Sequence, residues 1–173
     1  MNTHHPGLAL KLRALELEDL DFIYSIENDE ALWDVGINNV PYSKFSLTNY
    51  IMGSANDIYA DRQVRLMMEN LQGDPVGILD ITNFDPKHLR AEIGIVVAEQ
   101  ERHKGYALEA INQAIVYARE VLHLHQLYAL VNKDNFISVQ LFKTAGFEEG
   151  GILKQWLFLD KKYHDALLMQ FFL

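Results

Sequence analysis

Apolar residues follow a strand-like pattern at residues 90–97, near the middle of the chain. Ile93, Ile95 and Val97 are apolar at alternate positions, and Val96 makes the run apolar on both faces, which predicts a buried central strand. After a short polar turn, the period becomes that of an amphipathic helix. The apolar stripe of this helix consists of Ala107, Ala110, Ile111, Ala114, Ile115 and Ala118. The middle of the chain is therefore predicted to be a buried strand followed by a helix.

The part of the chain before this strand contains further strand and helix patterns. It predicts strands at residues 11–14, 63–69 and 76–81, and helices at residues 18–28 and 42–52. The sequence Gln-Gly-Asp-Pro at residues 72–75 predicts a hairpin turn between the last two of these strands. Residues 34–41 contain Gly, Asn and Pro, which predict a loop.

The part of the chain after the central helix completes the fold prediction. It predicts a strand at residues 126–131, a helix at 132–145, and an antiparallel pair of strands at 147–159 and 163–173. Gly146 directly follows the helix predicted at 132–145, at the place where a glycine often ends a helix. A helix between two neighbouring strands implies a parallel crossover, whereas the other strands are expected to be antiparallel. The predicted fold class is α/β, with one mixed sheet in a single domain of residues 1–173.

Composition narrows the classes of protein to consider. The length of 173 residues suffices for one domain with a real core, and an apolar fraction of 49% is ordinary for a globular protein. No apolar run reaches about 18 residues, which predicts no membrane span, and the first residues lack the order of a signal peptide. The absence of Cys suits a reducing, cytoplasmic location. The net charge of −9 argues against a nucleic-acid partner and is compatible with a cationic substrate.

Three bases, Arg102, His103 and Lys104, stand where the central helix begins. Cations at a helix N-terminus oppose the helix dipole by roughly 0.3–1 kcal/mol each, so their placement favours an anion bound at this turn. Gly105 and Ala107 keep side chains away from the backbone N–H groups, which lets phosphate oxygens reach them. The alternative interpretation is an ordinary turn between strand and helix, with solvated bases.

Two motifs resemble the GNAT superfamily of N-acetyltransferases. The turn Arg102-x-x-Gly105-x-Ala107 resembles the loop that binds the acyl-CoA pyrophosphate, and residues 135–147 resemble the helix that flanks CoA and ends in Gly-Phe. The order of strands and helices extends the resemblance over essentially the whole chain. It implies a GNAT fold, with acetyl-CoA as acetyl donor. The residues that we expect at the donor are Ile95, Val96, Val97, Arg102, His103, Lys104, Gly105, Tyr106, Ala107, Asn135, Ser138 and Phe142.

Within the superfamily, the chain looks most like spermidine/diamine N-acetyltransferases and the N-terminal acetyltransferases of ribosomal proteins. The sequence Leu-Arg-x-Leu-x-x-x-Asp-Leu at residues 12–20 is similar to both, whereas Arg-Ala-Glu at 90–92 and Tyr-x-Asp-Ala at 163–166 look like the polyamine enzymes. The resemblance implies transfer of an acetyl group to a primary amine of a small, polyamine-like cation. Acetylation of a protein N-terminus and a non-catalytic acyl-CoA-binding module are the alternatives. Homo-oligomer formation also stays open.

Acetyl transfer requires a neutral amine. An alkyl amine with a pKa of ~10.4 is neutral in about one molecule in a few thousand at pH 7, a cost of roughly 4–5 kcal/mol, and a nearby carboxylate can take its proton. Glu92 is the first candidate, because the resemblance puts the general base at this place in the central strand. The alternative is a surface acid paired with Arg90. Gly94 predicts a bulge that splays the parallel strands and frees the N–H groups of residues 95–97 for the thioester.

Asp80 is the second candidate for the base, because the polyamine enzymes carry a carboxylate at this end of the third predicted strand. An acid of the strand-end turn is the alternative. At Phe142 the superfamily often has a Tyr, whose hydroxyl is thought to protonate the leaving thiolate, and Phe cannot do so. Phe142 is then a core residue or an apolar wall of the CoA site. Tyr106, Tyr128 and Tyr163 are unranked candidates for the acid.

Eight acids and no Lys or Arg stand between Ala14 and Ser43. In the resemblance this segment forms one wall of the acceptor site, which makes Glu27 and Asp34 candidate substrate-binding residues and favours a cationic acceptor. The alternative is a solvated acidic helix face. Polyamine enzymes carry acids where this chain has Asn38 and Asn39, which argues against a regulatory polyamine site. The seven histidines show no spacing typical of a metal site, so no metal is expected.

Overall fold

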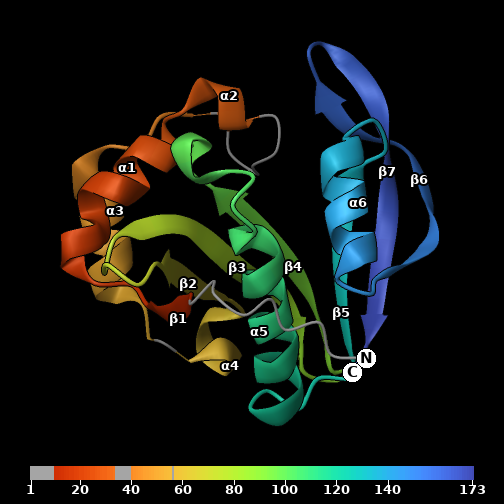
Figure 1. Ribbon diagram of the computed structural model, residues 1–173, viewed down its shortest axis with the longest axis horizontal. Coiled ribbons are helices and arrows are strands. Elements are labelled where there is room, and N and C mark those ends of the chain that lie inside the picture. The colour runs from red at the N-terminus through yellow and green to blue at the C-terminus, as the bar shows by residue number, and fades with distance from the viewer. Residues whose placement is uncertain (1–9, 34–39, 56) are drawn as a thin grey trace.

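The computed structural model describes residues 10–33, 40–55 and 57–173. The strands of this part of the chain form one seven-stranded sheet (Figure 1). The strands lie in the order β1-β2-β3-β4-β5-β7-β6. Their bounds are β1 Lys11–Ala14, β2 Val64–Glu69, β3 Pro75–Asp85, β4 Arg90–Val97, β5 Gln126–Asn132, β6 Glu148–Leu159 and β7 Lys162–Phe172. β4 and β5 are parallel, and the other neighbouring strands are antiparallel. The predicted mixed α/β fold class is confirmed.

Six α-helices occur in the described part of the chain. Their bounds are α1 Leu20–Glu27, α2 Glu30–Trp33, α3 Lys44–Gly53, α4 Ile58–Asp61, α5 Tyr106–Glu120 and α6 Phe136–Thr144. The sequence pattern does not predict α2 and α4, because one turn of helix is too short to show a period. The prediction that the last helix starts at residue 132 is wrong. That residue still pairs in β5, and the Asn135 side chain caps α6 by accepting from the Ser138 N–H at 3.1 Å.

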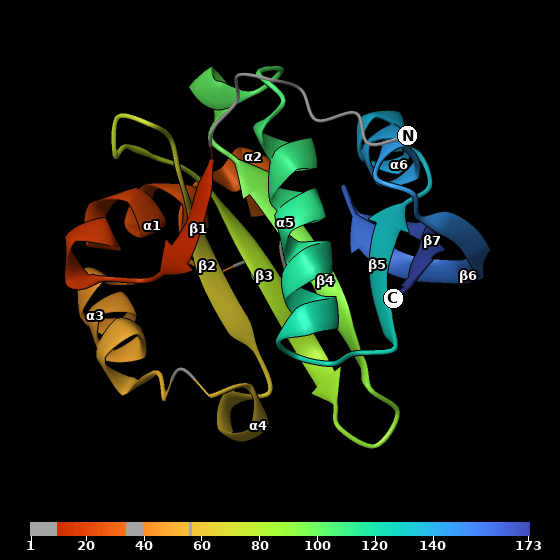
Figure 2. The same cartoon turned by 60° about the horizontal axis from the view of Figure 1, so that its bottom comes forward.

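The sheet separates two layers of helices. α5 and α6 pack on one face, where Ile111 and Leu127 belong to the larger apolar core. α1 and α3 pack on the other face, where Ile23 and Ile78 belong to a smaller core. Figure 2 shows α5 lying along the sheet, in front of β4. Because side chains alternate along a strand, polar residues that share the face of Ile78 lie on the side of α1 and α3.

The parallel strands β4 and β5 diverge along their length. Cα pairing joins only their first three residues, from the Arg90–Gln126 pair to the Glu92–Tyr128 pair. Beyond this point β4 continues to Val97 and β5 continues to Asn132, without a pair between them in the described residues. Backbone groups on this side of β4 are therefore left without a β5 partner, as expected from the bulge predicted at Gly94.

The bulge predicted at Gly94 is not the cause of this divergence. The register between β3 and β4 runs without a shift from the Gly77–Val97 pair to the Thr82–Glu92 pair, through Gly94. The irregularity in this pair of strands lies at the far end, between Thr82 and Asp85. The splay therefore arises on the β5 side, while the β3 side keeps a regular ladder that holds β4 in position.

No helix among the described residues is both long and apolar enough to cross a membrane.

Candidate functional site

A cavity of about 520 Å³ lies at the divergence of β4 and β5. Its walls come from α2, from β4, from the turn before α5, from the first turn of α5 and from α6. Ten of the residues expected at the donor line it: Ile95, Val96, Val97, Arg102, His103, Gly105, Tyr106, Ala107, Asn135 and Ser138. A volume in this range is typical of a site for a small organic ligand.

The turn before α5 has a backbone shape that exposes N–H groups to this cavity. Gly105 is the N-cap of α5 and has a φ of +88°, a conformation that glycine adopts at little cost. The first N–H groups of a helix have no partner within it, so those at the start of α5 are available to a ligand. The positive end of the helix dipole adds to the attraction for an anion. This end of the cavity can therefore hold phosphate groups.

The three bases of the turn differ in their placement. Arg102 lines the cavity and donates from Nε to the carbonyl of Val97 at 3.2 Å, which ties the turn back to β4. His103 also lines the cavity. Lys104 does not, and its ammonium group pairs with Glu101 at 2.9 Å. The structure thus brings Arg102 and His103 to the cavity and leaves Lys104 on the solvent side.

Phe142 lies in the apolar core below α6. Its side chain is 4% exposed, and its ring meets that of Phe147 edge to face, with centroids 5.0 Å apart. Phe142 is not among the residues that line the cavity. Leu141, one residue earlier, does line it, so the helix presents an aliphatic rather than an aromatic side chain to the site.

Glu92 is partly buried on the face of the sheet that carries α1 and α3. Its carboxylate accepts a hydrogen bond from the Asn83 amide at 2.8 Å. Arg90, expected as its alternative partner, forms its ion pair with Asp85 at 3.4 Å instead. Tyr128 stands opposite Glu92 across the parallel pair. Burial raises the pKa of the Tyr128 hydroxyl, and the negative charge of Glu92 adds to this.

Asp80 lies on the same face and has a cationic partner. It does not end its strand as predicted, because β3 continues to Asp85. Its two oxygens accept from Nε and Nη2 of Arg65, at 2.7 and 2.8 Å, and Arg65 Nη1 donates to Glu27 at 2.5 Å. The guanidinium also lies 5.6 Å from the ring centroid of Tyr50. Burial would lower the pKa of Arg65, but Asp80 and Glu27 together raise it, so Arg65 stays charged.

The acidic segment before α3 is partly neutralised by bases from elsewhere in the chain. Asp19 pairs with Arg13, Asp21 pairs with Lys44, and Glu27 pairs with Arg65. The formal charge of the segment therefore overstates the field that a ligand would meet. Asp34, the other expected substrate-binding residue, lies outside the described residues, as do Asn38 and Asn39.

The candidate tyrosines separate by position. Tyr106 lines the cavity, and Tyr128 is next to Glu92 on the sheet. Tyr163 is 67% exposed and contacts Phe158 on the β6–β7 hairpin. Among the described residues, no three His, Asp or Glu side chains gather closely enough to hold a metal ion.

Sequence comparison matches residues 9–148 to the acetyltransferase (GNAT) domain family. A spermidine N(1)-acetyltransferase from Vibrio cholerae is 30% identical over 160 residues, 92% of this chain and 91% of that protein. A [ribosomal protein uS5]-alanine N-acetyltransferase from Escherichia coli is 30% identical over 94 residues, 54% of this chain and 48% of that protein.

Solved structures give the same answer for the fold. The crystal structure of spermidine N-acetyltransferase from Vibrio cholerae in complex with CoA and spermine superposes with a TM-score of 0.82 at 30% identity, covering 94% of this chain and 95% of that one. A dodecameric structure of the same enzyme has a TM-score of 0.80 at 30% identity, over 94% of this chain and 93% of that one. The family match, the diverging strands and the turn before α5, which is capped by Gly105, agree, and this chain belongs to the GNAT family of acetyltransferases.

Proposed function

We propose that this enzyme transfers an acetyl group from acetyl-CoA to a primary amine of a small polycation such as a polyamine. The observation that carries the proposal is the cavity at the divergence of β4 and β5, which joins an anion-binding helix start to a strand carrying Glu92. The relative whose structure contains CoA and spermine supports both the donor and the acceptor class.

The donor end of the proposal rests on the turn before α5. The N–H groups at the start of α5 and the guanidinium of Arg102 would hold the pyrophosphate. The backbone of residues 95–97, which has no β5 partner, would receive the amides of the pantetheine arm and donate to the thioester oxygen as it becomes negative.

A matched pair of glycine substitutions tests this assignment. Gly105→Glu puts a negative side chain at the turn and should abolish CoA binding by calorimetry. Gly73→Glu replaces another glycine of positive φ, +86°, in an exposed turn with open space around it, and should keep wild-type CoA affinity. Unchanged CoA affinity in a folded Gly105→Glu variant would reject the assignment of the loop.

The chemical step in this proposal uses Glu92 as the base. Its carboxylate takes a proton from the ammonium group of the acceptor, directly or through water, and the neutral nitrogen attacks the thioester carbonyl. The new C–N bond forms, the C–S bond breaks, and the thiolate leaves with the electron pair. The nitrogen then loses its second proton, which the thiolate takes directly or through water, so that the products are the amide and the CoA thiol. A thiol pKa of ~8.5 makes thiolate a fair leaving group without an acid, so Phe142 is compatible with turnover.

The acceptor is tested with a panel of amines at fixed acetyl-CoA concentration. Release of CoA thiol should have a higher kcat/KM for spermidine than for a monoamine with a neutral tail. The advantage should shrink as salt is raised, because a cleft of one charge sign attracts ions of the other sign less strongly when it is screened. Equal efficiencies at low salt would reject the polycation.

Two alternatives have their own outcomes in the same panel. The E. coli relative that acetylates a ribosomal protein favours a protein N-terminus as acceptor, which predicts thiol release only with peptides. The buried Phe142 motivates a non-catalytic acyl-CoA-binding module, which predicts CoA binding without thiol release from any amine.

Assembly into a homo-oligomer is part of the proposal. The β6–β7 hairpin carries exposed apolar side chains, Ile152, Trp156, Phe158 and Tyr163, and the Vibrio cholerae relative is described as a dodecamer. Sedimentation of the purified chain should give a mass several times 19.9 kDa, and a monomer at micromolar concentration would reject this.

A further inference from the structure

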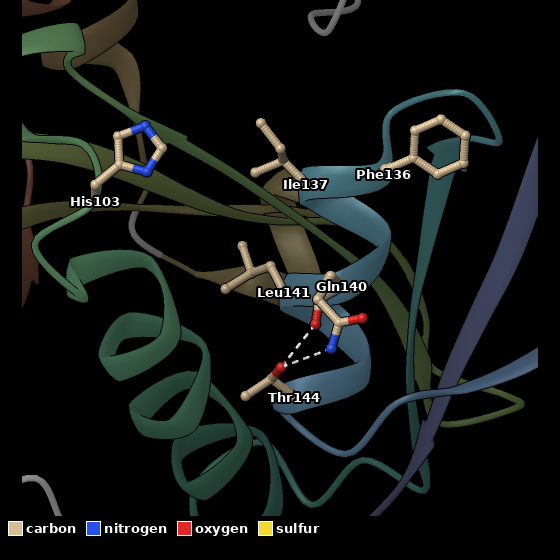
Figure 3. Close-up of a pocket in the computed structure, with 6 residues that line it drawn as sticks. All are labelled: His103, Phe136, Ile137, Gln140, Leu141 and Thr144. Atoms are coloured by element: carbon tan, nitrogen blue, oxygen red, sulfur yellow. Dashed lines mark hydrogen bonds between the residues drawn. The ribbon is translucent and has the colours of Figure 1, made fainter.

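Two further hollows of the protein differ in their relation to the donor cavity. A groove of about 440 Å³ lies between His103 and α6 (Figure 3). It shares His103, Ile137 and Leu141 with the donor cavity, so it belongs to the donor site already described. A pocket of about 290 Å³ lies at the ends of α3 and α4 and shares no residue with the donor cavity. We call it the α3 pocket.

The α3 pocket is lined mainly by polar side chains. They come from the second half of α3, from its C-cap, from the end of α4 and from the residue before β2. Figure 2 shows α4 at the end of the sheet where β2 begins. The Gln63 amide donates to the Tyr50 hydroxyl at 3.3 Å, which fixes one wall. The lining residues are Asn49, Tyr50, Gly53, Ser54, Asp61 and Gln63.

Asp61 is the charged residue of this pocket. It is partly buried, and its carboxylate accepts from two neutral donors, the Ser54 hydroxyl at 3.3 Å and the Ala55 N–H at 3.0 Å. No Lys, Arg or His of the described residues forms an ion pair with it, whereas other acids near this face, such as Glu27, have a cationic partner. α3 ends at the pocket with no base in its last turn, so the negative end of its dipole adds to the charge of Asp61. The pocket therefore attracts a cation.

Arg65 lies close to the pocket wall and does not cancel this charge. Its guanidinium is 5.6 Å from the ring centroid of Tyr50, but Asp80 and Glu27 balance it. Burial raises the pKa of Tyr50, and the carboxylates of Asp80, Glu27 and Asp61 add to this against the effect of Arg65. The Tyr50 hydroxyl therefore stays neutral, and the charge of the pocket is that of Asp61.

The α3 pocket lies on the same face of the sheet as Glu92. Gln63 continues the β2–β3 register and stands opposite Thr82, which pairs with Glu92 on β4. Two strand spacings separate Gln63 from Glu92, which is about 10 Å in total. An extended amine with one nitrogen at Glu92 is thus long enough to place a second nitrogen in the pocket.

We propose that the α3 pocket binds the far ammonium group of the acceptor, with Asp61 as its counter-ion. The inference rests on the proposed function, because it requires a polycationic amine as acceptor. It makes Asp61 a residue that determines which length of polycation the enzyme prefers. An amine with two charged ends about 10 Å apart occupies both Glu92 and Asp61, whereas a monoamine leaves the pocket empty.

The first experiment compares 1,8-diaminooctane with octylamine, which lacks only the far ammonium group. Release of CoA thiol at saturating acetyl-CoA gives KM and kcat for each amine. The wild type should have a KM at least roughly tenfold lower for the diamine, at similar kcat, because the far contact is made equally before and during reaction. In Asp61→Asn the two KM values should agree within about twofold, with kcat unchanged. Asp74→Asn removes the same charge in the exposed β2–β3 turn and should keep the wild-type difference.

A second variant fills the pocket without removing a charge. A Cβ at Gly53 would meet nothing within 4 Å, so Gly53→Leu should fold normally, with an unchanged melting temperature. It should raise the KM for 1,8-diaminooctane about tenfold and leave the KM for octylamine unchanged. Ala60→Leu adds the same side chain at an exposed position of α4 that does not line the pocket, and it should change neither KM.

Other results overturn the inference. A diamine advantage that persists in both Asp61→Asn and Gly53→Leu would place the far ammonium group elsewhere, while thiol release with the diamine would still support the proposed function. A fall in kcat for both amines in Asp61→Asn would make Asp61 a structural residue. Equal KM values in the wild type, or no thiol release with any amine, would reject the polycationic acceptor itself and the inference with it.

Discussion

Asp80 and Glu92 lie on the same face of neighbouring strands, and their surroundings differ in charge. Asp80 faces a guanidinium that donates to both of its oxygens, and Arg65 also holds Glu27. Glu92 faces a neutral amide, Asn83, which donates to one oxygen. The register places them diagonally, since Asp80 pairs with Gly94 and Glu92 pairs with Thr82. Two carboxylates on one surface therefore have different partners.

The difference indicates which carboxylate can accept a proton during turnover. Protonation of Asp80 would break a bidentate ion pair that is partly buried, with the Arg65 side chain only 22% exposed. Protonation of Glu92 breaks no ion pair in the described structure. We therefore assign the role of base to Glu92, and we regard Asp80 as a structural residue that fixes Arg65 and, through it, Glu27 on α1.

The largest expected effect is on turnover at neutral pH. Glu92→Gln should lower kcat at least 100-fold, since a positioned base contributes on this scale. Asp80→Asn should lower kcat less than about fivefold. Steady-state kinetics at saturating acetyl-CoA measures both, and a larger loss in Asp80→Asn than in Glu92→Gln would reverse the assignment.

Removal of Arg65 should be the largest effect on stability. Arg65→Met leaves Glu27 and Asp80 without their shared cation and should lower the free energy of unfolding by about 2–3 kcal/mol, less than for a fully buried pair. Urea denaturation measures this. The double substitution Arg65→Met with Asp80→Asn should recover part of the loss, because the charge of Asp80, which Arg65 no longer balances, is removed as well. Arg119→Met on the exposed face of α5 should change stability little, and an equal loss there would remove the special role of Arg65.

Two glycines of neighbouring strands should separate function from folding. A Cβ at Gly94 meets nothing within 4 Å on the face of Asp80 and Glu92, so Gly94→Val should fold normally and raise the KM for the amine about tenfold by filling the acceptor side. A Cβ at Gly77 would lie 2.4 Å from the carbonyl oxygen of Val96, so Gly77→Ala should lower the melting temperature instead. A normal KM in Gly94→Val would show that the acceptor does not pass this position.

The smallest expected effect concerns an ion pair distant from the proposed reaction. Burial would raise the pKa of Asp19, but hydrogen bonds from Arg13 and from the Glu16 N–H outweigh it and hold the pKa below the ordinary value of 3.8. This stabilisation is complete above pH 3.8 and is lost as the pH falls through the lowered pKa.

Arg13→Met tests the sign of that effect. It should cost about 1 kcal/mol of unfolding free energy at pH 7, and the difference from the wild type should shrink on acidification below pH 3.8. The midpoints of urea denaturation at pH 7 and below pH 3.8 measure this difference. Lys44→Met, which removes an exposed pair with Asp21, should show little change at either pH. A difference that grows on acidification would contradict the account.

The fold could be predicted from local patterns, because most of its elements carry their own period. The strand at residues 90–97 and the α5 helix follow from apolar spacing, and Gly105 marks the start of α5. The one-turn helices α2 and α4 have no such signal. We expected a bulge at Gly94 to splay β4 and β5, but β4 pairs with β3 in a regular register through Gly94. The apolar pattern of one strand cannot show with which of its two neighbouring strands the pairing ends.

The parts of the candidate site that are formed by residues close together in the sequence could be predicted. Contacts between residues far apart in the sequence were harder to predict. Arg102, His103 and Gly105 are contiguous, and they line the cavity together. Arg65 joins residues 15 and 38 positions away, a contact that no period reveals. Only the predicted hairpin pointed to the contact between Arg65 and Asp80. In the observed register of the β2–β3 pair, Arg65 lies opposite Asp80.

The most direct test of the account is the pH–rate profile of Glu92→Gln measured beside that of Asp80→Asn. Glu92→Gln should regain part of its kcat as the pH approaches the pKa of the amine, ~10.4, because the acceptor is then neutral without a base. Asp80→Asn should keep the wild-type profile, shifted only in amplitude. Recovery at high pH in Glu92→Gln alone would support Glu92 as the base. A Glu92→Gln profile parallel to the wild type, or recovery confined to Asp80→Asn, would contradict it.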